Sequence, residues 1–161
     1  MPDDWKIVFT RLDYFLAFGL GSGLAPVAPG TAGSALGLLL FIPALYAPFP
    51  VQVVIIALGF VLGVWVSDRV AKHMEVKDPG GIVWDEFVGM WITLLWLPSL
   101  FWLLPAFLLF RLFDIWKPWP VRVADKKLVG GLGIMLDDVF AGLYALAAVQ
   151  ILNGGLQQFI P

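Results

Sequence analysis

The chain has 161 residues, of which 60% are hydrophobic and 14% charged, and its formal net charge is −2. The apolar fraction exceeds the ~45–50% usual in soluble proteins and favours a membrane protein, while the small net charge gives no bulk attraction for nucleic acid. The absence of cysteine excludes disulfides, thiolate metal sites and a cysteine nucleophile, and the single histidine, His73, excludes any mechanism that needs two. By length, the chain is a single domain covering residues 1–161.

Apolar segments alternate along the chain with breaks that are rich in Pro and Gly. Residues 12–20 are too few to cross a hydrocarbon core of ~30 Å, which predicts an interfacial or re-entrant helix. Residues 21–34 contain Pro26 and Pro29 and predict a loop. Further helices are predicted at residues 34–46, 51–74, 86–97, 100–113 and about 138–152. A polar segment at 114–133 precedes the last of them.

The predicted fold class is all-α: a multi-pass membrane protein with about four to five membrane helices in hairpins and polar loops on one face. Pairing 34–46 with 51–67, and 86–97 with 100–113, puts every Lys and Arg on the same side, although arms of 12–14 residues are short for a full crossing. The positive-inside rule then makes that side cytoplasmic. The alternative takes 87–110 as one membrane span. It violates the positive-inside rule, because four basic residues would then lie outside the cell: Lys117, Arg122, Lys126 and Lys127. Two prolines within 87–110 also argue against an unbroken helix.

Two pairs of adjacent acids, Asp85-Glu86 and Asp137-Asp138, are each predicted to open a hydrophobic helix. An ionised side chain at mid-bilayer depth costs roughly 2.5–3.5 kcal/mol. Capping explains one acid of each pair, because a helix start needs one N-cap and its dipole stabilises an acid by ~0.3–1 kcal/mol. The second acid of each pair favours a site for a hard cation such as Mg²⁺, held by these four carboxylates. Asp114 is a further catalytic candidate.

The glycine-rich loop 21–34 offers a complementary site for an anion. Backbone N–H groups at a helix start near Gly33 and Ser34 can bind phosphate, although a plain re-entrant turn explains the loop equally well. The binding candidates here are Gly30, Thr31, Gly33 and Ser34. Lys117 and Arg111 flank Asp114 and could clamp phosphate oxygens, or they could extend to the lipid headgroups beside Trp116 and Trp119.

Four stretches of the chain, within residues 14–150 and in the right order, strongly resemble the phosphatidylglycerophosphatase A family. They are residues 21–34, 82–91, 110–120 and 130–138, and they contain all the acidic pairs and phosphate-binding candidates named above. The resemblance implies a multi-pass, magnesium-dependent phosphatase of the bacterial inner membrane with its active site facing the cytoplasm. Such an enzyme converts phosphatidylglycerol phosphate, an anionic lipid, to phosphatidylglycerol.

Two other functions remain as alternatives. A small transporter could use interfacial carboxylates as a cation site, although these acids are predicted at helix ends rather than along a bundle axis. A lipid phosphotransferase with CDP-linked donors would need acids on consecutive helical turns, whereas these are adjacent. The residues do not decide whether a carboxylate attacks phosphorus directly or only binds the metal and orients water.

Overall fold

The computed structural model describes residues 4–119 and 130–157, and every regular element in these two ranges is a helix. This confirms the predicted all-α class. The elements in chain order are α1 (Asp4–Thr10), α2 (Leu12–Ala17), the 3₁₀ helix η1 (Gly19–Leu24), α3 (Pro29–Phe41), η2 (Ile42–Tyr46), α4 (Phe49–Met74), α5 (Trp84–Thr93), η3 (Leu100–Trp102), α6 (Leu103–Trp116) and α8 (Gly130–Gln157).

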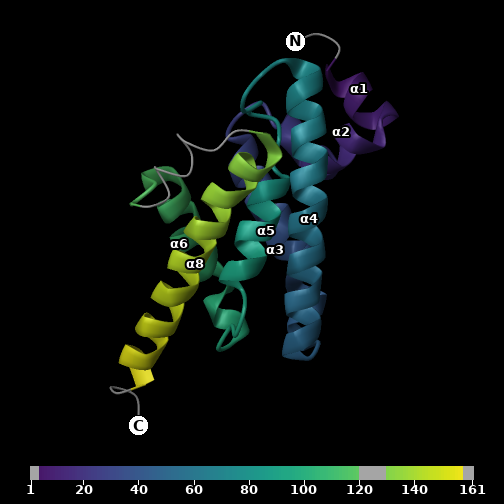
Figure 1. The fold of residues 1–161 in the computed structure, drawn as a ribbon. Helices are drawn as coiled ribbons and strands as arrows, with labels where there is room; N and C mark the ends of the chain where they lie inside the picture. The colour runs from purple at the N-terminus through teal and green to yellow at the C-terminus, as the bar shows by residue number, and fades with distance from the viewer. Residues whose placement is uncertain (1–3, 120–129, 158–161) are drawn as a thin grey trace.

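Within the described part of the chain, three helices are long and apolar enough to cross a membrane: Pro29–Tyr46, α4 and α8. Figure 1 places the turn before α4, the turn between α5 and α6, and the C-terminal end of α8 at one end of the bundle. Helices α1 and α2 and the segment after α4 lie at the other end. This arrangement agrees with the predicted hairpins, and the segments at the second end carry Lys6, Arg11, Arg69, Lys72 and Lys77 (Figure 1). Three of the basic residues fall outside the described ranges: Arg122, Lys126 and Lys127.

Two helix starts lie earlier than the sequence predicted. Helix α3 begins at Pro29 rather than Ser34. Proline is well suited to the first helical position, because the N–H that it lacks would have no partner within the helix there. Helix α8 begins at Gly130 rather than Asp138. Its glycines serve close packing, since a Cβ on Gly131 would clash with the carbonyl oxygen of Val64 in α4.

Helix α5 forms the centre of the bundle. It ends at Thr93 instead of the predicted 97, and nine of its ten residues are buried. At ~1.5 Å per residue it covers only about half of a ~30 Å hydrocarbon core. Its two indoles are fixed to neighbouring helices: Nε1 of Trp84 donates to the Gly59 carbonyl, and Nε1 of Trp91 to the Gly37 carbonyl, each over 2.9 Å. The start of α5 is therefore bonded to α4, and its later part to α3.

A smaller apolar cluster joins the N-terminal helices to the end of α4. It includes Val8, Tyr14 and Phe18 from the N-terminal segment and Val66 and Val70 from α4. Helix α2 has six residues and is followed directly by η1. The segment 12–20, predicted as one interfacial or re-entrant helix, is thus divided between two short helices, and α2 packs beside α4 (Figure 1).

Candidate active site

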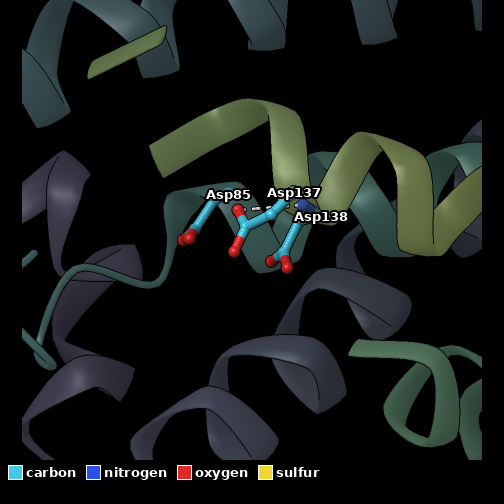
Figure 2. A group of neighbouring side chains, drawn as sticks. All are labelled: Asp85, Asp137 and Asp138. Atoms are coloured by element: carbon cyan, nitrogen blue, oxygen red, sulfur yellow. Dashed lines mark hydrogen bonds between the residues drawn. The ribbon is translucent and has the colours of Figure 1, made fainter. Parts of the chain in front are cut away.

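Three carboxylates from two helices meet inside the bundle. Asp85 lies in the first turn of α5, and Asp137 and Asp138 lie in α8 (Figure 2). One oxygen from each lies within 4.8 Å of the others, which is the arrangement expected of ligands for a single cation. We call these residues the carboxylate trio.

Asp137 and Asp138 are not helix caps. Because α8 begins at Gly130, both lie about two turns inside the helix, where both are buried. The Asp138 N–H donates to Oδ1 of Asp137 over 3.1 Å (Figure 2). The capping explanation is therefore wrong for this pair. At α5 the N-cap residue is Val83 and has no side-chain cap hydrogen bond, and Asp85 follows Trp84 in the first turn.

The trio fits a hard cation. Oδ1 of Asp85 and Oδ2 of Asp138 are buried and have no hydrogen-bond partner among the described residues. Three carboxylates this close repel one another, and burial removes the water that would screen them. Oxygen ligands of this kind suit Mg²⁺ or Ca²⁺. A bound divalent cation would satisfy both orphaned oxygens and offset the repulsion.

Glu86 lies outside the trio and belongs to a second polar network. Its Oε2 accepts a hydrogen bond from Oγ of Ser34 over 2.6 Å and forms an ion pair with Arg111. The same guanidinium nitrogen lies 2.8 Å from Oδ2 of Asp114. The other Glu86 oxygen, Oε1, faces α3 so closely that a Cβ on Gly30 would clash with it. The structure thus gathers four predicted site residues beside Gly30, from helices α3, α5 and α6.

Arg111 retains one free donor despite these contacts. Its guanidinium bonds Glu86, Asp114 and Ser34 through Nη1, whereas Nε is buried and has no partner among the described residues. A buried N–H without a partner is costly, by roughly 1–3 kcal/mol. An anion beside Arg111 would remove that cost. The site therefore has unpaired acceptors suited to a cation and an unpaired donor suited to an anion.

The remaining phosphate-binding candidates differ in their surroundings. Nζ of Lys117 lies 2.7 Å from Oδ2 of Asp137, so this lysine joins the end of α6 to the trio. Thr31 is exposed in the first turn of α3, where N–H groups lack intrahelical partners. Gly33 is buried against Val83, and a Cβ there would approach the valine Cβ to 2.7 Å. Gly33 thus serves packing between α3 and the start of α5.

Sequence reasoning missed how tightly the two halves of the site are linked. Ser34 was expected to contact phosphate through a helix start, but its hydroxyl also accepts from Arg111 and donates to Glu86. No sequence signal indicates this link, because the partners are far apart in the chain. Trp84 was also missed, although its indole hydrogen bond fixes the residue directly before Asp85. A tryptophan next to an acidic pair was the available signal.

Known proteins resemble the chain over most of its length. A family model described as phosphatidylglycerophosphatase A matches residues 15–153. The phosphatidylglycerophosphatase A of Escherichia coli (strain K12) is 42% identical over 149 residues, which cover 91% of this chain and 82% of the relative. The phosphatidylglycerophosphatase A of Haemophilus influenzae (strain ATCC 51907 / DSM 11121 / KW20 / Rd) is 49% identical over 148 residues, or 89% and 90% of the two chains.

A third relative carries a different name. A protein of Bacteroides thetaiotaomicron, provisionally named phosphatidylinositol-3-phosphatase, is 37% identical over 150 residues, covering 87% of this chain and 92% of its own. No solved structure matches the chain. The family model and the two relatives of the same name cover the helices that hold both polar networks. The chain is a phosphatase that belongs to the phosphatidylglycerophosphatase A family.

Proposed function

We propose that the chain hydrolyses phosphatidylglycerol phosphate to phosphatidylglycerol and inorganic phosphate, as a step of phospholipid biosynthesis. The observation that carries this proposal is that unpaired acceptor atoms and an unpaired donor atom occur together in one buried polar site. Asp85 and Asp138 have orphaned acceptors, and Arg111 has an orphaned donor. A phosphomonoester substrate would supply the anion for the donor of Arg111. A divalent cation bound with it would supply the partner for the acceptors of Asp85 and Asp138. The names of two relatives supply the lipid.

Magnesium is the proposed cofactor, and the trio Asp85, Asp137 and Asp138 would hold it. When bound, Mg²⁺ supplies charge neutralisation and polarises the phosphoryl group. Glu86 was predicted as a fourth ligand; we now propose that it fixes Arg111, together with Asp114, which contacts the same guanidinium nitrogen. Two carboxylates on one arginine prevent its side chain from changing rotamer as substrate binds and leaves.

The phosphate would be held by cations and backbone donors on the α3 and α6 side of the trio. Nε of Arg111 and Nζ of Lys117 are the charged donors, and the first-turn N–H groups of Gly30 and Thr31 are the backbone donors. Phosphoryl transfer depends mainly on positioning and charge neutralisation, which these groups provide. In this arrangement the lipid phosphate lies between the start of α3 and the end of α6.

The proposed location is the bacterial inner membrane, with the site open to the cytoplasm. Both polar networks lie toward the end of the bundle that carries α1 and α2 (Figure 1). The basic side chains of the helix segments nearest that end include Arg69, Lys72 and Lys117, and under the positive-inside rule they support a cytoplasmic orientation.

The substrate is tested by phosphate release from the purified protein in detergent. Dispersed phosphatidylglycerol phosphate is compared with phosphatidylinositol 3-phosphate, because one relative is provisionally named a phosphatidylinositol-3-phosphatase. We expect clear turnover of the glycerol lipid and at least about tenfold lower kcat/KM for the inositol lipid, a difference of ~1.4 kcal/mol. A preference for the inositol lipid would refute the proposed substrate. Absence of hydrolysis, with cation uptake into liposomes, would support the transporter instead.

A further inference from the structure

A second charged site lies away from the carboxylate trio, where α2 packs against α4. An open cleft of about 380 Å³ is lined there by Arg11, Leu12, Asp13, Trp65 and Arg69. We call it the arginine cleft. It shares no residue and no helix with the carboxylate trio, and the proposed reaction does not use it.

The depth of the cleft matches the surface of a membrane. At ~1.5 Å per residue, the part of α4 from Phe49 to Arg69 extends over ~30 Å, the thickness of the hydrocarbon core. With Phe49 at the opposite edge of the core, Arg69 would lie at headgroup level and Trp65 one turn deeper. The side chains of Leu12 and Trp65 are 72% and 54% exposed, so the cleft presents an apolar surface beside its two guanidinium groups. Such a surface suits a molecule with an acyl chain and an anionic headgroup.

The charged groups of the cleft are held in place before any ligand binds. Asp13 is buried and accepts from both Nε and Nη2 of Arg11, over 3.1 and 2.7 Å. Nη1 of Arg11 lies 3.0 Å from Nε2 of His73. A guanidinium can only donate, so Nε2 accepts, and the neutral ring donates from Nδ1 to Tyr14, whose hydroxyl is 2.7 Å away. Arg11 is thus held through all three nitrogens of its guanidinium group.

Arg69 is the group available to a ligand. It contacts Asp13 through Nε, at 3.0 Å, and its side chain is 58% exposed. Its guanidinium carbon lies 5.7 Å from the centroid of the Trp65 ring, which restrains the side chain along the wall of the cleft. The terminal nitrogens of such a fork match the oxygens of a phosphate in a bidentate contact.

We propose that the arginine cleft binds the phosphodiester headgroup of an anionic membrane phospholipid, at a site separate from the catalytic one. Two guanidinium groups and one carboxylate leave one net positive charge, with His73 neutral. That charge matches a phosphodiester, which carries one negative charge, better than a phosphomonoester, which carries ~1.5–2. The exposed Leu12 and Trp65 would contact the acyl chains.

The test is retention of lipid by the purified protein, measured by native mass spectrometry after exchange into detergent containing phosphatidylglycerol or phosphatidylcholine. The variant is Arg69→Gln. The matched control is Lys72→Gln, which removes one positive charge on the same helix at a residue paired with Asp68 and outside the cleft. Phosphatidylglycerol bound elsewhere, including at the catalytic site, is the background common to both variants.

We expect the wild-type protein to retain one more phosphatidylglycerol than Arg69→Gln and to show no such excess with phosphatidylcholine. Lys72→Gln should behave as wild type, and Arg69→Lys should recover part of the binding. The fall in affinity for Arg69→Gln should be at least about tenfold. Equal retention by Arg69→Gln and Lys72→Gln would overturn the proposal and leave Arg69 as a membrane anchor. Full displacement by soluble glycerophosphoglycerol at the lipid's own concentration would also overturn it, because the acyl contacts would then contribute nothing.

Discussion

Lys117 and Asp137 form an ion pair of 2.7 Å that ties the end of α6 to the carboxylate trio. The lysine side chain is 29% exposed and the carboxylate 11%, so the pair has one member at the surface of the site and one inside it. Lys117 also ends α6 in a left-handed conformation, with φ of 47°. The geometry therefore places a cation at the edge of the carboxylate trio, where it offsets part of the repulsion among the carboxylates.

If Lys117 also binds the substrate phosphate, its removal slows the reaction on any form of the substrate. Lys117→Ala should lower kcat/KM roughly ten- to hundredfold, the loss expected for a charge-assisted hydrogen bond of ~1.5–3 kcal/mol. Lys117→Arg should rescue only part of this. The measurement uses a short-chain substrate dispersed in detergent, where anchoring to a bilayer matters little. Full activity of Lys117→Ala there would contradict a role for Lys117 in binding the phosphate.

The absence of a side chain at Gly30 makes room for the carboxylate of Glu86. Because a Cβ at this position would clash with Oε1 of Glu86, Gly30→Ala should push the carboxylate away from Ser34 and Arg111. We expect turnover to fall at least about tenfold with the protein still folded. Gly80→Ala is the matched control, since a Cβ there meets no atom within 4 Å. Equal phosphate release by the two variants would contradict a role for the Glu86 position.

Single cysteines can report the topology directly, because the chain has none of its own. Ser99→Cys lies in the exposed turn between α5 and α6, and Val76→Cys follows α4 at the opposite end. An impermeant thiol reagent added to intact cells should label Ser99→Cys but not Val76→Cys. Both should be labelled after the cells are opened. The reverse pattern would place the active site outside the cytoplasm.

The Arg11 guanidinium beside Asp13 holds the pKa of that carboxyl below its usual range. A carboxyl with a lower pKa in the folded state adds stability above its unfolded pKa of about 3.9, and that stability is lost as the pH falls through the folded value. From about pH 5 to about pH 3, the melting temperature in detergent should therefore fall less for Asp13→Asn than for wild type. Glu75→Gln, at an exposed position, should follow wild type. Parallel curves for all three proteins would show that Asp13 contributes nothing.

The sequence was sufficient to predict helices, hairpins and the side of the bundle that carries charge. Apolar segments broken by Pro and Gly determine where the chain turns, and adjacent acids in such segments are conspicuous. It was insufficient at Gly131, which locally favours a loop but lies in α8, where α4 packs closely against it. Local propensity cannot show this, since the decisive contact is with Val64, far away in the chain.

The division of the acids into two networks was equally beyond the sequence. Adjacent residues on a helix lie about 100° apart, so Asp85 and Glu86 must face different neighbours. Which neighbours they face depends on how α3, α6 and α8 pack around α5. The structure turns Asp85 toward Asp137 and Asp138, and Glu86 toward Ser34 and Arg111.

The most direct test of the carboxylate trio is phosphate release from dispersed phosphatidylglycerol phosphate, after chelation and then with added Mg²⁺. Wild type and the exposed-site control Glu75→Gln should lose activity with chelator and recover it with Mg²⁺. Asp85→Asn and Asp138→Asn should stay at least about a hundredfold slower at every Mg²⁺ concentration, a loss of ~2.7 kcal/mol, while eluting as folded protein. Wild-type rates in both Asn variants, or activity that survives chelation, would contradict the account.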